Sequence, residues 1–373
     1  MPAAVKIERY AYIDWMRGLA CLIMFEVHGY DSWLTDSLRQ TTLFRLSQLS
    51  GTMAAPLFLF LAGASLALVS DRMRRKSATP SQIERRMALR GFEIIGLGYL
   101  LRLQEYAMAY PKSPWTDLLR VDILNTIGIS LVLMAVVWRI FKTRAAIASV
   151  SLAISAAIVL ATPLLWTTMR PRWLPWYLES YVNGVHTFDA PQGWLFPIFP
   201  WTGFAFAGLA LGCFIFDEWA MENVEKTVGL LGIAGAAIFL ISIAIDRLPI
   251  QIYSTYDYWH TSPAFFLARV GVLLILFPLS YAWCRWGWGA LKFRPAVWLG
   301  ETSLLVYWVH IVFVYGHLSI LKKNHQTIAT ATLGILIVTA AMVSLAWTRL
   351  RWKGHGAELL AKLKSSLRFQ TAR

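Results

Sequence analysis

Apolar segments of about 20 residues recur along the whole chain, and this is the length that an α-helix needs to cross the hydrocarbon core of a bilayer. Hydrophobic residues make up 57% of the 373 residues and charged residues only 15%, a balance that excludes a soluble globular protein. The apolar runs therefore predict an all-α polytopic membrane protein with about ten transmembrane helices. The expected spans are 12–31, 52–70, 87–106, 121–141, 145–162, 196–216, 228–246, 263–284, 295–318 and 328–347.

The distribution of basic residues predicts how these spans are oriented. Of the 35 Lys and Arg residues, 22 fall on the side that holds both termini and nine on the opposite side. Cytoplasmic loops carry the excess of Lys and Arg, so we expect both termini in the cytoplasm. The first apolar run follows Lys6 and Arg9 without a small-residue cleavage site, so we expect a retained span. The formal charge of +14 does not indicate a nucleic-acid partner, because the basic residues are spread over the loops.

The spans predict one transmembrane domain over residues 1–348, followed by a basic amphipathic cytoplasmic tail over residues 349–373. We expect the protein in the lipid bilayer of a bacterial inner (plasma) membrane, where a homodimer is possible. The three cysteines, Cys21, Cys213 and Cys284, all fall within predicted spans. That placement is typical of core residues and favours neither a disulfide nor a metal site.

The stretch from Asp14 to Trp33 is an apolar helix that carries charges. Arg17 and His28 are eleven residues apart, so they share one helical face at a separation of about 16 Å along the axis. Steps of three residues place Asp14 beside Arg17 and Asp31 beside His28, so that one carboxylate can hold the arginine and the other can orient the imidazole. A lone arginine here would snorkel and a lone histidine would cap the helix at the interface. Their combination favours an interior site.

Basic residues cluster between the second and third spans and at the start of the third, where they include Arg72, Arg74, Arg75, Arg86 and Arg90. Membrane topology alone explains such a cluster, and so does the binding of an anionic ligand such as the phosphates of coenzyme A. The third span also places Arg90 three residues before Glu93, and Arg102 three residues before Glu105. Ions within a membrane are costly, so we expect both pairs to face the interior of the bundle.

Two regions suggest contacts with a polar substrate. The connection 163–195 is rich in Trp, Pro and Tyr, and His186 and Asp189 are its polar pair. Its tryptophans belong either to the interfacial belt or to an aromatic platform for a sugar-like acceptor. In the ninth span, Tyr307 and His310 share a stripe with Ser303, Val314 and His317. The spacing matches no metal-ligand motif, so it favours a hydrogen-bonded core histidine over a metal ligand or a proton relay.

Six sequence blocks occur in order between about residues 10 and 317: DWMRGLA, PLFLFLAGASLAL, RRMALRG, RVDILNTIG, FDAPQG and GETSLLVYWVHIVF. Together they resemble the transmembrane acyltransferase superfamily and, within it, the heparan-α-glucosaminide N-acetyltransferase-like branch. The resemblance implies a membrane enzyme that moves an acyl group, usually acetyl, from cytoplasmic coenzyme A to a hydroxyl or amine of an extracytoplasmic saccharide. Arg17 and His28 match the arginine and histidine of the first helix in the O-acetyltransferases of this superfamily. Residues 32–51 contain no histidine, so the loop histidine of the heparan enzyme has no counterpart there.

These observations together give each candidate residue an expected role. His28, oriented by Asp31, is the expected base for the acceptor, and Arg17, held by Asp14, is expected to line the channel for the thioester arm. The expected phosphate ligands for acetyl-CoA are Arg72, Arg74, Arg75, Arg86 and Arg90. The expected acceptor contacts are Arg120, His186, Asp189, Tyr307 and His310.

Two other classes of protein stay open on the sequence. A secondary transporter would use Arg17, Glu93 and Arg269 as substrate or proton sites, although the chain shows no clear internal repeat. A membrane scaffold without enzymatic activity would leave the buried ions unexplained.

Overall fold

The computed structural model describes residues 11–111, 113–184, 196–249, 252–286 and 294–370, and side chains up to residue 352. Within these ranges the regular elements are helices, and the single β-bridge joins Leu34 and Gln326. The predicted all-α class is therefore confirmed. The chain divides into two compact units, a first unit of Met1–Ala54 with Ala282–Arg373 and a second unit of Ala55–Tyr281.

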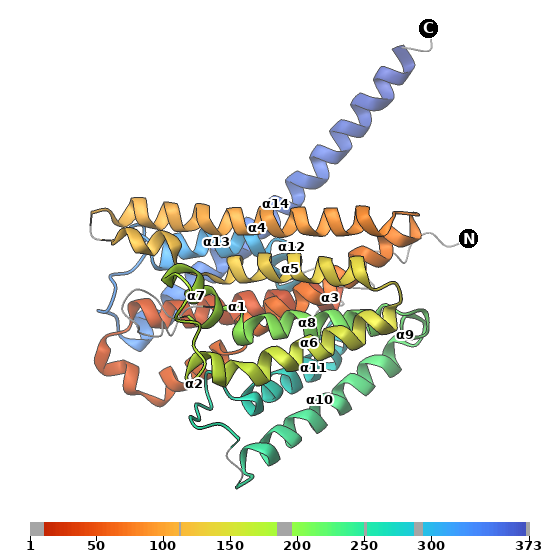
Figure 1. Ribbon diagram of the computed structural model, residues 1–373. Helices are drawn as coiled ribbons and strands as arrows, with labels where there is room; N and C mark the ends of the chain where they lie inside the picture. The colour runs from red at the N-terminus through yellow and green to blue at the C-terminus, as the bar shows by residue number, and fades with distance from the viewer. Residues whose placement is uncertain (1–10, 112, 185–195, 250–251, 287–293, 371–373) are drawn as a thin grey trace. The chain divides into compact units, whose positions relative to one another are not determined.

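The first unit combines the beginning and the end of the chain (Figure 1). Its elements are α1 (Ala11–Trp33), η2 (Asp36–Gln40), α2 (Thr42–Gly51), α12 (Pro295–Glu301), α13 (Ser303–Val314) and α14 (Ile328–Gln370). Two glycines let α1 and α12 touch along their backbones. A Cβ on Gly18 would lie 1.8 Å from the carbonyl oxygen of Ala296, and one on Gly300 would lie 1.8 Å from that of Asp14. The blocks DWMRGLA and GETSLL, from opposite ends of the sequence, therefore meet here.

The second unit holds the middle of the chain. Its elements are α3 (Ala54–Arg75), α4 (Pro80–Ala109), η3 (Trp115–Leu119), α5 (Ile123–Ile140), α6 (Arg144–Trp166), α7 (Trp176–Asn183), α8 (Ile198–Ile215), α9 (Glu218–Glu222), α10 (Val224–Asp246) and α11 (Pro263–Trp286). Small residues set the contact of α3 with α8 and let the two backbones approach closely. A Cβ on Gly63 would lie 1.9 Å from the Ala205 carbonyl oxygen, and one on Gly208 would lie 1.9 Å from that of Phe60.

Capping residues explain where two long helices begin. Thr79 and Gln82 form a reciprocal capping box at the start of α4, with Pro80 at its first helical position. Asp122 and Asn125 form the same arrangement at the start of α5. The block RVDILNTIG thus fixes the entry to a membrane helix, because its polar side chains satisfy amide groups that the helix itself leaves unpaired.

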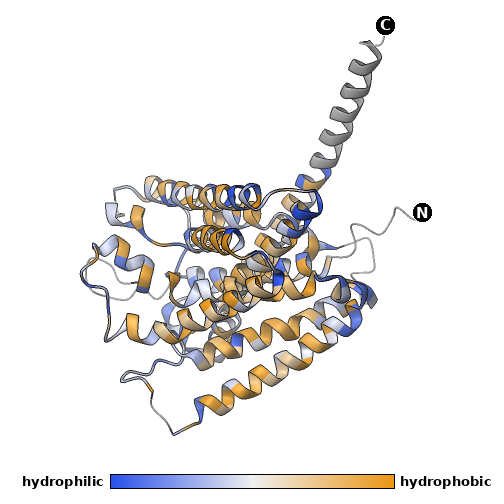
Figure 2. Cartoon of the chain, turned by 45° about the vertical axis from the view of Figure 1, so that its right-hand side comes forward, coloured by the Kyte–Doolittle hydropathy of each residue, from blue (hydrophilic) through white to orange (hydrophobic). Residues whose placement is uncertain are grey.

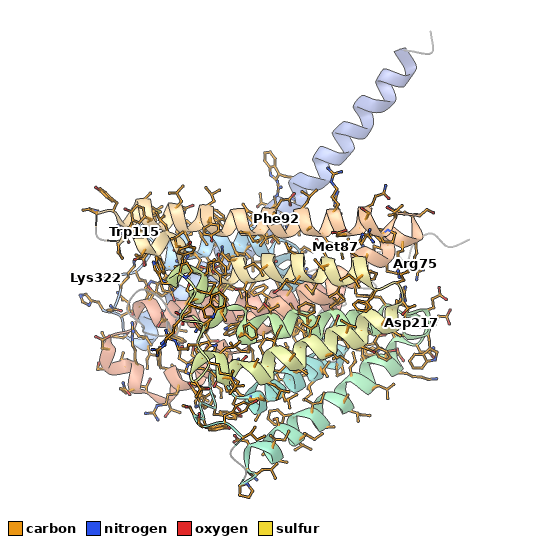
Figure 3. All side chains as sticks on the ribbon, in the orientation of Figure 1. Arg75, Met87, Phe92, Trp115, Asp217 and Lys322 are labelled. Atoms are coloured by element: carbon orange, nitrogen blue, oxygen red, sulfur yellow. The ribbon has the colours of Figure 1, made fainter. Side chains whose placement is uncertain are left out.

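Hydrophobic residues run along the long helices of the molecule (Figure 2). Large apolar side chains such as Phe92 on α4 and Trp115 on η3 are exposed in the isolated chain (Figure 3), as expected for a surface in contact with lipid. Among the described residues, seven helical segments are long and apolar enough to cross a membrane, or eight if the bent pair α12 and α13 is one span. The chain is therefore an integral membrane protein. The helices α1 and α4 are not among these segments, because each contains too many charged residues. The predicted total of ten membrane-spanning helices therefore stays a prediction.

The ninth predicted span, 295–318, is wrong as a single helix. The structure divides it into α12 and α13, which are bent by 95° at a break. The break falls at Thr302 in the sequence Gly-Glu-Thr-Ser, where Gly, Thr and Ser are weak helix formers. The Thr302 hydroxyl donates to the carbonyl of Trp298 at 2.8 Å and competes with the helical hydrogen bonds. His317 consequently lies beyond the end of α13, outside the predicted stripe.

Candidate active site

The first unit contains a partly buried ion pair close to the contact of α1 with α12. The Nη1 atom of Arg17 donates to Oδ1 of Asp14 at 2.8 Å, and the two side chains are 22% and 28% exposed. The same nitrogen lies 3.5 Å from the carbonyl oxygen of Gly300. The predicted pairing of Asp14 with Arg17 is therefore confirmed. Because Gly300 has no side chain, the guanidinium can reach the backbone of α12.

Two histidines meet between α1 and α13. The Nδ1 atom of His28 lies 3.0 Å from Nε2 of His310, and His310 is fully buried. The ring planes differ by only 13°, while the ring centroids are 5.2 Å apart. That separation exceeds the nitrogen distance by about two ring radii, so the rings lie edge to edge in nearly one plane and not face to face. This geometry suits a linear hydrogen bond between the two nitrogens.

The second hydrogen bond of His310 settles which nitrogen carries each proton. Nδ1 of His310 lies 3.0 Å from the carbonyl oxygen of Val306. A carbonyl only accepts, so Nδ1 of His310 is the donor, and in a neutral ring its Nε2 is then an acceptor. His28 must therefore donate through Nδ1. The remaining nitrogen of a neutral His28, Nε2, carries a lone pair and is the basic atom of the pair.

Asp31 does not orient His28 in the way the sequence predicts. Its Oδ2 atom accepts from the hydroxyl of Tyr315 at 2.9 Å, and its backbone carbonyl accepts from Arg39 at 2.6 Å. Within the described residues, Asp31 and His28 share no hydrogen bond. The Tyr315 ring packs edge-on against His28 with centroids 5.3 Å apart, so the side chain that binds Asp31 also contacts His28. The sequence offered only one signal for Tyr315, its position near the end of the predicted ninth span.

Aromatic side chains enclose the histidine pair. The Phe25 ring lies 5.0 Å from the His310 ring, and the Tyr307 ring approaches His310 edge-on at 5.7 Å. Of the predicted acceptor contacts, His310 thus lies beside His28, and Tyr307 packs against His310. The prediction of a hydrogen-bonded core histidine at position 310 is confirmed.

The predicted phosphate ligands all belong to the second unit, and several of them already have partners within it. Arg75 binds Asp71 at 2.9 Å, and Arg74 donates to the carbonyl of Lys142 and stacks on Trp138 at 5.1 Å. Arg72 and Arg86 lie on the surface. Their role in binding coenzyme A stays a prediction.

Arg90 corrects the expectation that both ion pairs of the third span face inward. Arg90 does bind Glu93 at 3.0 Å, but the two side chains are 54% and 63% exposed. The buried stripe of α4 consists of Ile83, Met87, Gly91, Ile94, Gly98 and Leu101, and it leaves this pair outside the helix contact. Arg102 is different. Its side chain is only 12% exposed and binds both Glu105 and Asp122, so the prediction holds for this second pair.

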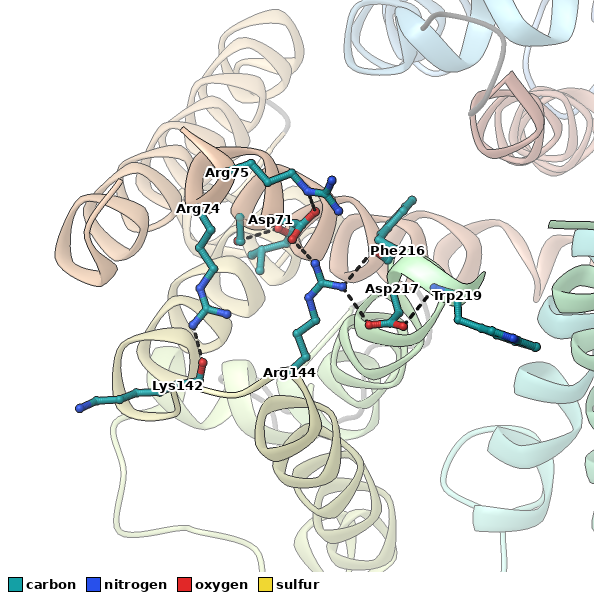
Figure 4. A network of polar contacts seen from close by, with 10 residues as sticks. Asp71, Arg74, Arg75, Lys142, Arg144, Phe216, Asp217 and Trp219 are labelled. Carbon is teal, nitrogen blue, oxygen red and sulfur yellow. Dashed lines mark hydrogen bonds and ion pairs between the residues drawn. The ribbon is translucent and has the colours of Figure 1, made fainter. Parts of the chain in front are cut away.

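Figure 4 shows a polar network that the sequence did not predict. Arg144, at the start of α6, binds Asp71 near the end of α3 and Asp217 at the start of α9. Its Nη1 atom also donates to the carbonyl of Phe216 at 3.1 Å. One arginine therefore ties three segments together at one end of the second unit.

Arg120 and its surroundings define a second polar region of the second unit. Arg120 caps η3, and its backbone amide donates to Asp117. Nearby in sequence, Asn125 donates to the hydroxyl of Tyr181 at 3.2 Å, and Tyr99 shares a hydrogen bond with the same hydroxyl. Burial and the bond with Tyr99 raise the pKa of Tyr181 above its usual range, so this phenol stays neutral. The role of Arg120 in acceptor binding stays a prediction.

Some predicted residues lie in parts of the chain that the structure does not describe. His186 and Asp189 lie outside the described residues, and so do residues 371–373 of the predicted tail. The described part of the chain holds no group of three or more His, Cys, Asp or Glu side chains placed to bind a metal ion.

One buried cation differs from the rest. Arg269 lies on α11 and is 7% exposed. An arginine at the centre of a membrane helix costs about 2.5–3.5 kcal/mol on insertion scales, and such residues are normally paired. Among the described residues Arg269 has no ion pair, and the transporter hypothesis was the only one that used it.

The comparison with protein families gives one match. The family model described as "Heparan-alpha-glucosaminide N-acetyltransferase, catalytic" matches residues 9–244. The match covers Asp14, Arg17 and His28 and the predicted phosphate ligands, whereas His310 lies beyond it. A comparison with individual curated proteins finds no match.

Proposed function

Because the chain belongs to the heparan-α-glucosaminide N-acetyltransferase catalytic family, we propose that it moves an acetyl group from cytoplasmic acetyl-CoA to an amine or hydroxyl of an extracytoplasmic saccharide. In this proposal the chain spans a bacterial inner membrane about ten times, with both termini in the cytoplasm. The positive-inside distribution of Lys and Arg supports that orientation.

The observation that carries the mechanism is the hydrogen bond between His28 and His310. It leaves Nε2 of His28 as the basic atom, and this atom accepts the proton of the acceptor hydroxyl or amine. As the proton leaves, the acceptor oxygen or nitrogen bonds to the acyl carbon and the carbon–sulfur bond breaks. The proton then passes from Nε2 to the departing sulfur, which leaves as a thiol. His28 ends the cycle in its starting state.

His310 is a positioning residue in this mechanism. Its Nε2 atom accepts the Nδ1 proton of His28, both before and after His28 gains a proton. The bond from His310 to the Val306 carbonyl holds the ring in the required tautomer. A neutral histidine thus takes the place that a carboxylate holds in many base-orienting pairs.

Arg17 has a separate role in the proposal. On a regular helix it lies about 16 Å from His28 along the axis, which is too far to contact the same acyl oxygen. Its ion pair with Asp14 and its contact with Gly300 support a role in lining the path of the thioester arm. The phosphates of acetyl-CoA are assigned to the exposed cations Arg72, Arg86 and Arg90, with Arg74 and Arg75 at the edge of the group.

An acetyl-transfer assay tests the proposal. Purified protein in lipid nanodiscs is incubated with acetyl-CoA labelled in the acetyl group and a panel of saccharides with free amines or hydroxyls. We expect label on at least one saccharide, and its loss with His28→Ala. If wild-type protein labels none of them, while liposomes show His28-dependent, proton-coupled uptake of a solute, the transporter hypothesis replaces this one.

A further inference from the structure

Three side-chain hydrogen bonds join the last two turns of α1 to the end of α13. They are the bonds of His28 with His310 at 3.0 Å, of Tyr315 with Asp31 at 2.9 Å and of Ser32 with the Val314 carbonyl at 2.9 Å. On α1, His28 and Ser32 are four residues apart, and His310 and Val314 have the same spacing on α13. Residues at this spacing share a helical face, so the three bonds lie along one seam between the helices.

The bond to His310 restrains only one atom of the His28 ring, Nδ1. An imidazole held at one nitrogen can still tilt, and a tilt moves Nε2, the atom that receives the proton in the proposed reaction. The Tyr315 ring supplies a second contact, at 5.3 Å between centroids and with an angle of 63° between the ring planes. The His310 ring lies within 13° of the His28 plane. One neighbour therefore lies nearly in the plane of the imidazole and the other meets it at a steep angle, so together they restrain its tilt.

Tyr315 can restrain His28 because several of its own atoms are held. Its hydroxyl donates to Oδ2 of Asp31 at 2.9 Å, and its backbone amide donates to the carbonyl of Ile311 at 2.8 Å. Its carbonyl accepts from the side chain of Lys323. A tyrosine side chain has only two rotatable bonds, so a hydrogen bond at the hydroxyl leaves the ring little freedom.

Asp31, which holds Tyr315, belongs to a segment that is itself tied down. The Nη2 atom of Arg39 donates to the backbone carbonyl of Asp31 at 2.6 Å and to Oδ1 of Asn324 at 2.7 Å. The backbone amide of Asn324 donates to the carbonyl of Ser32 at 3.1 Å. The connection that follows α13 is thus bound to the end of α1 through both backbone and side chains.

We propose that Tyr315 is a positioning residue for His28, and that Asp31 serves the site by holding Tyr315. This role rests on the proposed function, in which Nε2 of His28 is the basic atom. Asp31 acts indirectly, because its carboxylate binds the phenol and the phenol ring contacts the imidazole. The bond with His310 selects the tautomer of His28, and the contact with Tyr315 fixes the direction of Nε2.

Substitutions of the two partners separate this indirect role from a direct one. Tyr315→Phe loses the hydroxyl and keeps the ring, so kcat should fall about 2- to 10-fold, the usual effect of one hydrogen bond, with little change in KM. Asp31→Asn should keep most of the rate, since an amide oxygen still accepts from the phenol. Asp31→Ala should match Tyr315→Phe, and the double variant should fall no further, because both changes remove the same bond.

A direct pairing of Asp31 with His28 predicts a different pattern. In that case Asp31→Asn and Asp31→Ala lower kcat alike, and Tyr315→Phe keeps the wild-type rate. This result would overturn the proposal.

Ser32→Ala is the matched control for helix packing. The Ser32 hydroxyl joins the same two helices, and the proposed mechanism gives it no role. The Val314 carbonyl also accepts from the Ser319 hydroxyl at 3.0 Å, so the substitution leaves it with a donor. We expect a small fall in unfolding temperature at the wild-type kcat. If Ser32→Ala lowers kcat as Tyr315→Phe does, the seam serves helix packing alone and the positioning role is rejected.

Nitrogen NMR tests the position of His28 without acetyl transfer. The protein carries isotope-labelled histidine in nanodiscs without ligand, and the His28 signals are assigned by their loss in His28→Gln. Wild-type protein should show one His28 tautomer, protonated on Nδ1, as the bond to His310 requires. Tyr315→Leu, which removes the ring, should give a mixture of tautomers, and Ser32→Ala should keep the wild-type signals.

Tyr315→Phe gives the same NMR comparison if Tyr315→Leu fails to fold, and it should shift the His28 signals in the same direction by a smaller amount. Wild-type signals in every folded Tyr315 variant would overturn the proposal. Because the NMR experiment uses no acetyl-CoA, it decides on Tyr315 even if the wild-type protein transfers no acetyl group.

Discussion

The Nδ1 atom of His28 lies 3.0 Å from Nε2 of His310, although 282 positions separate the two residues. The bond joins α1 to α13, so the candidate base and its partner come from opposite ends of the chain. His310 lies outside the family-matched region 9–244. The catalytic arrangement proposed for this family member therefore depends on residues that follow the matched region.

His28→Ala should lower the rate of acetyl transfer by about 10²–10⁴-fold, the usual contribution of a positioned base. Acetyl-CoA binding should be unchanged, because the assigned phosphate ligands belong to other helices. Initial rates with labelled acetyl-CoA measure the first effect, and equilibrium binding measures the second.

The other histidines are controls for this variant. His317→Ala and His260→Ala should keep wild-type rates, since the proposed mechanism gives neither residue a role. If His28→Ala retains more than about a tenth of the activity while His186→Ala abolishes it, the base lies in the connection 163–195 and not on α1.

His310→Leu should lower kcat by at least about tenfold with little change in KM, because His28 loses the acceptor that fixes its tautomer. His310→Gln should recover part of the loss, since an amide oxygen can accept the Nδ1 proton of His28. A purely structural role for His310 predicts the opposite order of variants or equal losses in both. Circular dichroism and unfolding temperatures confirm that the compared variants are folded.

The sequence predicted the local parts of this site and missed the long-range parts. Asp14 and Arg17 are three residues apart on one helix, so helical periodicity alone brings them together. Periodicity also placed Asp31 beside His28, but it could not identify the hydrogen-bond partner of His28, because helical spacing relates only residues of the same helix. The side chains that contact His28 are His310 and Tyr315, and they reach it only because α13 packs on α1. The spacing of residues along one sequence does not predict which helices pack together.

The same limit applies to the helices themselves. Apolar runs located every long helix, because burial in lipid demands uninterrupted hydrophobic length. They did not reveal the break at Thr302, because the short polar stretch Gly-Glu-Thr-Ser lies between two apolar runs that were read as one span, whereas the backbone turns by 95° there. Nor did they reveal that Arg144 joins Asp71 to Asp217, since these residues occupy three different segments.

Gly63→Ala should destabilise the protein by about 1–3 kcal/mol, the usual cost of overpacking a tight contact. The new Cβ would lie 1.9 Å from the carbonyl oxygen of Ala205, so α3 and α8 must move apart. Gly96→Ala is the matched control on α4, because nothing lies within 4 Å of its Cβ position. Thermal unfolding in detergent compares them, and equal unfolding temperatures would contradict the close packing of α3 on α8.

Asp71→Asn should destabilise the second unit by up to about 3 kcal/mol, near the lower end of the range for breaking a buried ion pair. The side chain of Asp71 is 10% exposed and binds both Arg75 and Arg144. The loss is limited because Arg144 keeps Asp217 at 3.2 Å.

Glu84→Gln is the control for this network. It breaks the exposed pair with Arg139 and should cost less than about 1 kcal/mol. The network would have no structural role if both variants unfolded at the wild-type temperature.

Arg86→Glu and Arg90→Glu should each weaken acetyl-CoA binding if the cationic cluster receives the phosphates. Both side chains lie on the surface of α4, so charge reversal there leaves the packed stripe of the helix intact. A hydrogen bond to a charged group contributes about 1.5–3 kcal/mol, which corresponds to a rise in Kd of roughly 10- to 100-fold. Arg86 tests the assignment more cleanly than Arg75 or Arg90, because reversal at Arg75 would also break its pair with Asp71 and reversal at Arg90 would break its pair with Glu93. Arg172→Glu is the control, because Arg172 is an exposed cation on the connection assigned to the opposite side of the membrane.

Binding of labelled acetyl-CoA at low and high salt gives the measurement, and the wild-type affinity should fall with salt because the attraction is between exposed charges. Unchanged Kd values for Arg86→Glu and Arg90→Glu would leave the cluster with a role in membrane orientation alone.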